Sequence, residues 1–185
     1  IIHKLIRNNI DKHFHTFNNT LDIVTFIENS IIKYTKYDNN YPLNGGIAFP
    51  VGVSINDVAA HDTPYNNKIL INKDDILKID YGVHINGCIS DGAFSISPSG
   101  KYNELIKISE CATKIGIKNS GPECILGEIG KEIQDYIESK EITIDNKVYP
   151  VKSIYNLSGH NMAPYIIHLN KAVPNIKIPY YERMK

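Results

Sequence analysis

Apolar and polar residues alternate along the stretch from Lys78 to Ile96, on both sides of the dipeptide Asn86-Gly87. Alternation with a period of two predicts β-strands. Asn-Gly between two such runs is typical of a two-residue hairpin turn, because both turn positions need a positive φ. The core face of the predicted hairpin consists of Ile79, Tyr81, Val83, Ile85, Phe94 and Ile96. Its directly opposed pairs would be Ile85 with Cys88, Gly82 with Asp91 and Asp80 with Ala93.

Four further segments carry apolar residues at the spacing of three or four that predicts amphipathic helices. They are residues 2–15, 20–37, 101–119 and 125–140, and Thr20 is the expected cap of the second one. Extended chain is expected over residues 45–56 and 151–157, and a second hairpin over 141–150, with its turn at Asp145-Asn146. This order predicts an α+β fold, with helices packed on one side of a mainly antiparallel sheet.

The composition is that of a globular protein with balanced charge. Hydrophobic residues make up 42% of the 185 residues, and 20 basic side chains are matched by 20 acidic ones. No apolar run approaches the ~18 residues of a membrane span. No secretory pattern opens the chain, and no basic cluster indicates a nucleic-acid surface. Because Cys88, Cys111 and Cys124 lack metal-ligand spacing, we expect reduced thiols in a cytoplasmic protein.

The two ends of the chain suggest a piece of a longer protein. The chain opens on Ile1 rather than on methionine, and it stops at Lys185 without a turn or cap signal. At this length we expect residues 1–185 to form a single incomplete domain that is truncated at both ends.

Asp80 and Asp91 would share the face of the hairpin that lies opposite its core face. Their register makes them diagonal neighbours, with backbones about 7–8 Å apart. Aspartate is disfavoured in strands, and two carboxylates on one face repel each other, so a cation between them would relieve the repulsion. From the spacing alone two interpretations stay open, a solvated sheet face and a shared metal site.

Three histidines come from distant segments of predicted extended chain. His61 ends a run of small residues, 58–60, that we expect to be buried, and by itself it indicates a core or edge residue. His160 and His168 lie close together in sequence. With the two carboxylates, these side chains suit a hard or borderline divalent metal. Because no serine-hydrolase, phosphate-cradling or dinucleotide motif occurs, the residues favour a metal hydrolase.

Four motifs resemble those of the type 2 methionine aminopeptidases. They are Gly46-Ile-Ala-Phe-Pro-x-Gly-x-Ser-x-Asn56, Ala59-Ala-His-x-Thr-Pro64, Lys78-Ile-Asp-Tyr-Gly-Val-His-Ile-x-Gly87 with Asp91, and Asn156-Leu-x-Gly-His160 with Ile167-His168. They follow the order and spacing of that family across nearly the whole chain. The resemblance implies the pita-bread fold of peptidase family M24, with its C-terminal part missing and a dinuclear metal centre in its middle.

The resemblance also implies a set of metal ligands. Asp80 would bind one metal ion, Asp91 would bridge two ions, and His160 would be the histidine ligand. The cofactors would be two divalent ions, of cobalt, manganese, iron or zinc. His84 matches no ligand of the family, and we interpret it as a structural or supporting residue.

The substrate-side residues follow from the same resemblance. His61 and His168 would be the catalytic histidines, which contact the scissile amide and the tetrahedral intermediate. The apolar walls of the pocket for the substrate methionine would be Phe49, Leu157 and Ile167, whose side chains suit that role.

The chain also departs from the family pattern. The family's last two ligands are glutamates that would lie beyond Lys185, so three of five ligands are present. Ser158 replaces an asparagine, and Ala163-Pro164 stands where the family commonly has polar residues. Pro164 has no backbone N–H, which could shift His168. We therefore expect weak metal binding and little activity from this chain by itself.

The resemblance implies a metalloaminopeptidase that removes the initiator methionine through a hydroxide activated by two metal ions. Its substrates would be the N-termini of nascent polypeptides, and it would be a cytoplasmic monomer with the ribosome as a candidate partner. The alternative is a non-catalytic, proliferation-associated pita-bread protein that binds the ribosome or nucleic acid. Such relatives usually lose the metal aspartates, which this chain keeps. An X-Pro dipeptidase is disfavoured by the stretch Ala59-Ala-His-x-Thr-Pro64.

Overall fold

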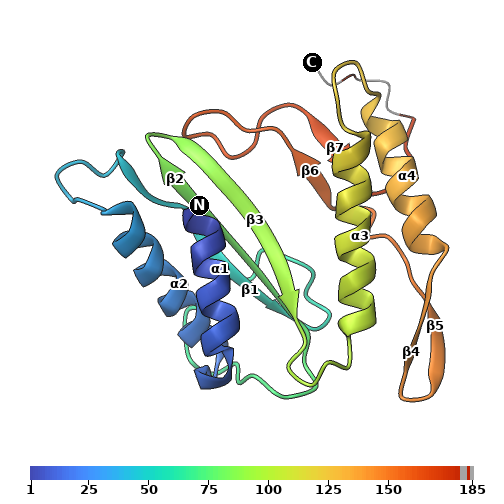
Figure 1. Cartoon of the computed structure of the whole chain (residues 1–185), viewed down its shortest axis with the longest axis horizontal. Coiled ribbons are helices and arrows are strands. Elements are labelled where there is room, and N and C mark those ends of the chain that lie inside the picture. Colours follow the sequence, from blue (N-terminus) through green and yellow to red (C-terminus); the bar gives the residue numbers. More distant parts are fainter. Residues whose placement is uncertain (180–182, 184–185) are drawn as a thin grey trace. The chain divides into compact units, whose positions relative to one another are not determined.

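The computed structural model describes residues 1–179 and 183, and the chain divides into two compact units. The first unit comprises residues 1–100 and 162–168, and the second comprises residues 101–161 and 169–185. Figure 1 labels the elements of both. The single domain over residues 1–185 stays a prediction.

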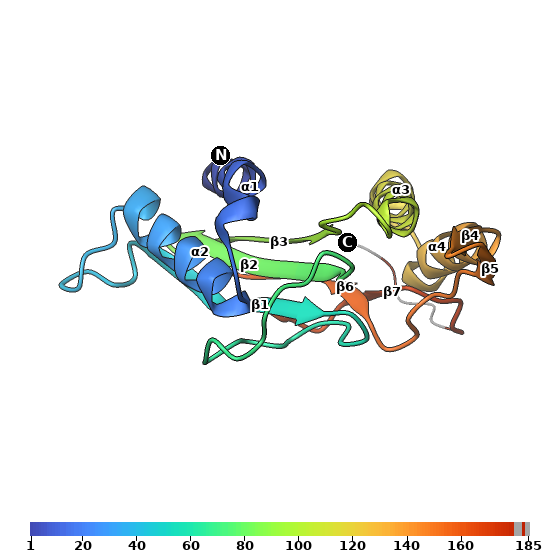
Figure 2. The same ribbon diagram turned by 90° about the horizontal axis from the view of Figure 1, so that it is seen from below.

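The first unit is a three-stranded antiparallel sheet with two helices on one side. Its elements are α1 (Ile2–His13), a 3-10 turn (Phe14–Thr16), α2 (Thr20–Thr35), β1 (Gly45–Ile55), β2 (Leu77–Ile85) and β3 (Cys88–Ile96), with the strands in the order β1-β2-β3. Figure 2 shows α1 and α2 on the same side of the sheet. The core between helices and sheet is formed by Ile6, Ile10, Ile23, Val24, Ile27, Ile31, Val51, Val53, Leu77, Ile79, Tyr81 and Val83.

The β2–β3 hairpin has the predicted turn and register. Asn86 and Gly87 form the loop with φ of 48° and 79°, as a type I′ turn requires. The pairs Ile85–Cys88, Gly82–Asp91 and Asp80–Ala93 are directly opposed. One residue of the predicted core face is not buried: Ile85, at the hairpin tip, is 41% exposed.

The predicted cap of α2 is wrong by one residue. Asn19 is the cap: its side chain accepts from the Asp22 N–H at 3.1 Å, and the Asp22 carboxylate accepts from the Asn19 N–H. This reciprocal pair is a capping box in which aspartate takes the usual place of glutamate. Thr20 is instead buried, with 1% of its surface exposed.

Asp75 ties the start of β2 to the end of β1. Its carboxylate is 7% exposed, and it accepts from Asn56 Nδ2 at 2.9 Å and from the Asn72 N–H at 2.7 Å. Burial alone would raise the pKa of this carboxyl, but hydrogen bonds from Asn56 and Asn72 outweigh burial and hold the pKa below its ordinary value. The ionised carboxylate therefore stabilises the fold, and this contribution is lost as the pH falls through the lowered pKa.

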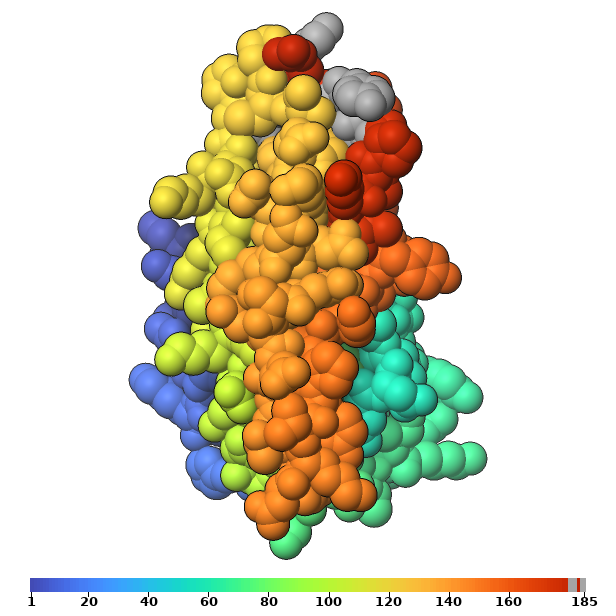
Figure 3. Space-filling model, turned by 90° about the vertical axis from the view of Figure 1, so that its right-hand side faces the viewer, coloured from blue at the N-terminus to red at the C-terminus, as the bar shows by residue number. Residues whose placement is uncertain are grey.

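The second unit packs two helices against each other and against short strands. Its elements are α3 (Asn103–Asn119), α4 (Leu126–Glu138), β4 (Glu141–Ile144), β5 (Lys147–Pro150), β6 (Ser158–His160) and β7 (Ala172–Pro174). The β4–β5 hairpin turns at Asp145-Asn146, as predicted, with φ of 50° and 62°. Figure 3 looks onto this unit, with α3, α4 and the hairpin in yellow and orange.

The fold class agrees with the prediction from the sequence. Every sheet in the described residues is antiparallel, and the helices are long, so the chain is α+β. Across residues 1–179 and 183, no helix combines the length and apolar character that a membrane span needs.

Candidate metal centre

Asp80 and Asp91 lie on the sheet face that α1 and α2 leave uncovered. Ile79 and Tyr81, which flank Asp80 in sequence, are fully buried on the helix side, and successive side chains of a strand point to opposite faces. Asp91 is directly opposite Gly82, two residues along β2 from Asp80, so the two carboxylates are diagonal neighbours. Both residues are half-buried. Oxygen ligands in this arrangement suit a hard or borderline divalent cation.

Phe49 of β1 lies on the same face, with its ring over Gly82 of β2. The register between β1 and β2 shifts twice, from Ile47 to Phe49 and from Phe49 to Gly52, and these β-bulges bring Phe49 opposite Gly82. A Cβ on Gly82 would lie 2.3 Å from Phe49 Cε1 and 3.0 Å from Ala48 Cβ. The absence of a side chain at Gly82 therefore makes room for the Phe49 ring beside Asp91.

Replacing Gly82 by alanine (Gly82→Ala) is expected to displace the Phe49 ring and to lower the free energy of unfolding by about 1 kcal/mol. The cost is limited, because the ring is half-buried and can turn outward. Urea denaturation measures the loss. The matched control is Gly52→Ala on β1, where the new Cβ would meet its nearest atoms at 3.7 Å. An equal effect of the two substitutions would contradict this packing.

The loop that carries His61 runs along β1 at the same site. The Asp62 carbonyl accepts from the Val53 N–H at 2.8 Å. A Cβ on Gly52 would lie 3.7 Å from this carbonyl oxygen and 3.7 Å from Asp80 Cβ. The expectation that residues 58–60 are buried is wrong, because Val58 is exposed and the two alanines after it are half-buried. His61 is exposed and has a φ of 63°. His61 therefore sits in a strained surface loop whose next residue, Asp62, lies near Asp80.

Tyr165 attaches the segment 162–168 to the tip of the hairpin. Its N–H donates to the Gly87 carbonyl at 3.0 Å, and its hydroxyl donates to the Leu43 carbonyl at 3.0 Å. A Cβ on Gly87 would lie 2.5 Å from the Tyr165 ring, so the ring rests on the turn itself. This attachment brings Ile167, half-buried, and His168, exposed, into the first unit.

Pro164 fits this segment without loss of a hydrogen bond. Ala163 and Ile166 exchange two backbone hydrogen bonds, of 3.0 and 2.9 Å, around Pro164 and Tyr165. Tyr165 has a φ of 61°. Proline at the second position of a turn and a positive φ at the third are typical of a type II turn. The residue at the second position donates no hydrogen bond within such a turn, so proline can occupy it. Pro164 thus shapes the turn that precedes His168.

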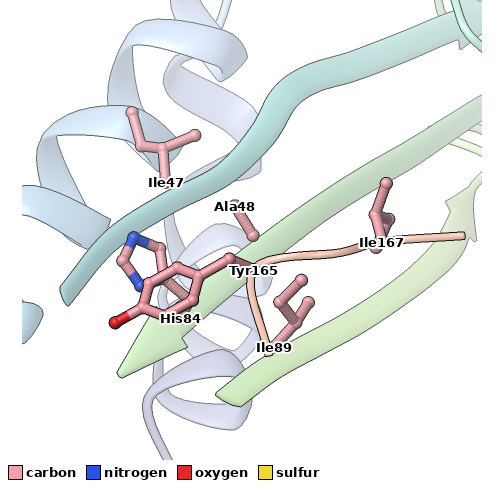
Figure 4. Close-up of a pocket in the computed structure, with 6 residues that line it drawn as sticks. All are labelled: Ile47, Ala48, His84, Ile89, Tyr165 and Ile167. Carbon is pink, nitrogen blue, oxygen red and sulfur yellow. The ribbon is translucent and has the colours of Figure 1, made fainter. Parts of the chain in front are cut away.

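A pocket of about 210 Å³ opens beside His84 and Tyr165, and Figure 4 shows the side chains that line it. Its lining residues are Ile47, Ala48, His84, Ile89, Tyr165 and Ile167. His84 is directly opposite Ile89 and shares the face of Asp80 and Asp91, since it follows Gly82 by two residues. Its ring lies 5.9 Å from the ring of Tyr165, and its buried Nδ1 has no hydrogen-bond partner in the described residues. The alternation along β2 was the signal that could have placed His84 on the face of the aspartates.

Leu157 and His160 belong to the second unit. His160 ends β6 and is opposite Ala172 of β7. Leu157 and His160 are both half-buried. The next residue, Asn161, holds the end of this ladder, because its side-chain Oδ1 accepts from the Lys171 N–H at 3.0 Å. Across residues 1–179 and 183, the structure gathers no group of three histidine, cysteine, aspartate or glutamate side chains that could hold a metal ion.

Comparison with known proteins gives a family and a fold. The model of metallopeptidase family M24 matches residues 2–184. The chain is 41% identical over 174 residues to methionine aminopeptidase 2 of Debaryomyces hansenii, covering 94% of this chain and 41% of the relative. For the protein of the same name in Yarrowia lipolytica the identity is 42%, covering 95% and 37%. The chain therefore spans about two-fifths of the length of these relatives.

Solved structures show the pita-bread fold that the sequence predicted. A methionine aminopeptidase from Rickettsia prowazekii superposes with a TM-score of 0.77 at 23% identity, covering all of this chain and 71% of that one. A dipeptidase from Pyrococcus horikoshii gives a TM-score of 0.67 at 18% identity, covering 97% and 47%. At these identities the likeness concerns the fold, which different peptidases share.

Proposed function

The chain belongs to metallopeptidase family M24, and on that premise we propose that it is part of a metalloaminopeptidase that removes the initiator methionine from nascent proteins. The observation that carries the proposal is the pair Asp80 and Asp91, diagonal neighbours on the sheet face that also bears a pocket lined by four aliphatic and two aromatic-ring side chains. The curated relatives named methionine aminopeptidase 2 support the choice of methionine. A non-catalytic binding protein would have no use for two repelling carboxylates at this place.

We assign the metal ligands of this chain as Asp80, Asp91 and His160. Two carboxylates and one imidazole fit a divalent ion such as cobalt, manganese, iron or zinc, and we propose that two ions bind. When bound, such ions supply a hydroxide nucleophile near neutral pH and polarise a carbonyl. The position of Asp91 opposite Gly82, two residues along β2 from Asp80, would let both carboxylates hold the same metal centre.

The remaining residues bind and orient the substrate in this proposal. His61 and His168, both exposed, would donate hydrogen bonds to the scissile amide of the substrate. Ile167 lines the pocket, and Phe49 lies beside it over Gly82. With Leu157, these side chains would hold the methionine side chain through apolar contacts. The carboxylates, the histidine loop and the pocket lie on one face, so one peptide N-terminus could reach all of them.

The natural partners would be the N-termini of nascent polypeptides, and the ribosome that delivers them. A methionine-removing enzyme of this kind would act in the cytoplasm, because its substrate appears there during synthesis. We propose that it acts as a monomer. This chain spans about two-fifths of its relatives' length, so we expect the full-length protein to carry the activity and the chain alone to show little.

Removal of metal is expected to abolish the activity of the full-length protein. Dialysis against EDTA should lower the rate of methionine release from the peptide Met-Ala-Ser by at least about a hundredfold, because the ions provide the nucleophile. Added Co²⁺, Mn²⁺, Fe²⁺ or Zn²⁺ should restore it, and the ion that does so best identifies the cofactor. Quantitative amino-acid release measures the rate, with Lys-Ala-Ser as the control peptide. Undiminished release after metal removal would refute the proposal, and no release with any ion would favour the non-catalytic alternative.

A further inference from the structure

The imidazole of His3 lies behind the two aspartates, on the opposite face of the hairpin. His3 Nε2 is 3.2 Å from the Tyr81 carbonyl oxygen and 3.2 Å from the Gly92 carbonyl oxygen. Tyr81 and Gly92 are directly opposed, and each directly follows one of the aspartates in sequence. One side chain of α1 therefore joins the two strands at the pair of residues next to Asp80 and Asp91.

Three features fix the His3 ring in this position. The ring stacks on Tyr81, with centroids 4.0 Å apart and an interplanar angle of 7°. The Tyr81 hydroxyl donates to the His3 carbonyl at 2.8 Å. A Cβ on Gly92 would lie 2.9 Å from His3 Cε1, so the ring occupies the space that glycine leaves open on β3.

A second contact of α1 supports the same docking. One turn after His3, the Arg7 guanidinium lies 3.5 Å above the centroid of the Phe94 ring. Phe94 follows Gly92 by two residues on the same face of β3. Helix α1 therefore follows the back of the hairpin along the stretch that presents the aspartates on the front.

The chemistry of the contact requires His3 to be a donor. Both groups that face Nε2 are carbonyl oxygens, so this nitrogen carries a proton, which it shares between them. A carbonyl oxygen has two lone pairs and can accept this hydrogen in addition to a ladder N–H. Such a shared bond holds the two carbonyls, and with them the peptide units that follow Asp80 and Asp91, at a fixed separation.

We propose that His3 is a positioning residue that sets the separation of the Asp80 and Asp91 carboxylates through its Nε2–H bond to the Tyr81 and Gly92 carbonyls. The inference rests on the proposed metal site, because the aspartates are its ligands there. Groups that orient metal ligands from outside the coordination sphere contribute about 10- to 100-fold to metal affinity. His3 acts on the backbone rather than on the carboxylates themselves, so we expect an effect near the lower end.

The test separates the donor from the ring. His3→Phe keeps a flat ring against Tyr81 and removes the donor, whereas His3→Gln keeps an N–H donor and removes the ring. The matched control is His13→Phe, an exposed histidine on the same helix. Each full-length protein is freed of metal and titrated with Co²⁺ by calorimetry, and the visible absorption of bound Co²⁺ is recorded at saturation. Urea denaturation of the metal-free proteins measures stability separately.

We expect His3→Phe to weaken Co²⁺ binding about tenfold and to change the intensity of the Co²⁺ absorption bands. His3→Gln should stay within about twofold of the wild type, and His13→Phe should equal it. A role in packing alone would give the reverse order, with His3→Phe close to wild type and His3→Gln weakened, and would overturn the inference while leaving the metal site intact. Absence of Co²⁺ binding by the wild type would overturn the metal site itself, and the inference with it.

Discussion

Replacement of Asp91 by asparagine (Asp91→Asn) in the full-length protein is expected to lower kcat/KM for methionine release from Met-Ala-Ser by at least about a thousandfold. Asparagine has nearly the same size and keeps a carbonyl oxygen, so the hairpin and its turn should form unchanged. It lacks the negative charge with which the Asp91 carboxylate would bind a divalent cation. The expected loss therefore comes from the metal site and not from the fold.

Two measurements separate these causes. Metal analysis of the purified protein should show less than the wild-type content of bound ion, and circular dichroism should show an unchanged fold. The matched control is Asp74→Asn, an exposed aspartate in the turn before β2, which should keep full turnover. Retained turnover in Asp91→Asn would show that Asp91 is not a ligand, even if the protein proves to be a peptidase.

The turn and the register of the β2–β3 hairpin could be predicted because the information that sets them is local. The Asn-Gly pair defines the turn, and the turn defines the register, so alternation alone assigns each side chain to a face. Sequence alone therefore places Asp80 and Asp91 together, and the observed pairs agree. The roles of these two residues as metal ligands come from the resemblance to a family and not from the hairpin pattern.

The features that the sequence did not reveal depend on contacts between distant segments. Two bulges in β1 bring Phe49 opposite Gly82, and strict alternation along β1 would give a different partner. The small residues before His61 predicted a buried segment. The loop instead contacts β1 through the hydrogen bond between the Asp62 carbonyl and the Val53 N–H, and the side chain of His61 is exposed. Small residues indicate close approach of backbones as well as burial, and sequence alone does not separate the two.

Pro164 and His84 show the same limit in the site itself. Loss of a backbone donor at Pro164 could be expected to disturb His168, but the turn around it needs no donor at that position. His84 could be placed on the aspartate face by counting along β2. The pocket around His84 also depends on Tyr165, whose N–H donates to the Gly87 carbonyl. Tyr165 lies 78 residues after Gly87 in the chain, so this contact could not be read from the hairpin sequence.

Gly130 of α4 is the glycine whose replacement should destabilise the second unit most. A Cβ at this position would lie 2.5 Å from the Ile176 carbonyl oxygen and 2.7 Å from the Pro174 carbonyl oxygen. Both are backbone atoms, so no rotation of a side chain relieves the clash. The Gln134 side chain also accepts from the Lys177 N–H at 2.7 Å, which ties this segment to the same helix.

The substitution Gly130→Ala sets two effects against each other. Alanine in a helix interior is favoured over glycine by about 1 kcal/mol, whereas overpacking against an immobile backbone costs about 3 kcal/mol. The expected net loss in the free energy of unfolding is about 2 kcal/mol by urea denaturation. The matched control is Gly116→Ala on α3, where the new Cβ would meet the flexible end of Ile133 at 3.1 Å, and which should be neutral or stabilising by up to about 1 kcal/mol.

The Co²⁺ affinity of the Gly130→Ala variant shows whether the clash moves only residues 174–176 or shifts the whole of β7. Pro174 and Ala172 pair with Ser158 and His160 across the β6–β7 ladder, so movement of β7 away from α4 would carry His160 with it. If His160 is a metal ligand, Co²⁺ affinity of the full-length protein should fall along with stability. Unchanged affinity in a destabilised variant would mean that the clash is absorbed at residues 174–176, and equal stability of the two alanine variants would refute the close contact between α4 and β7.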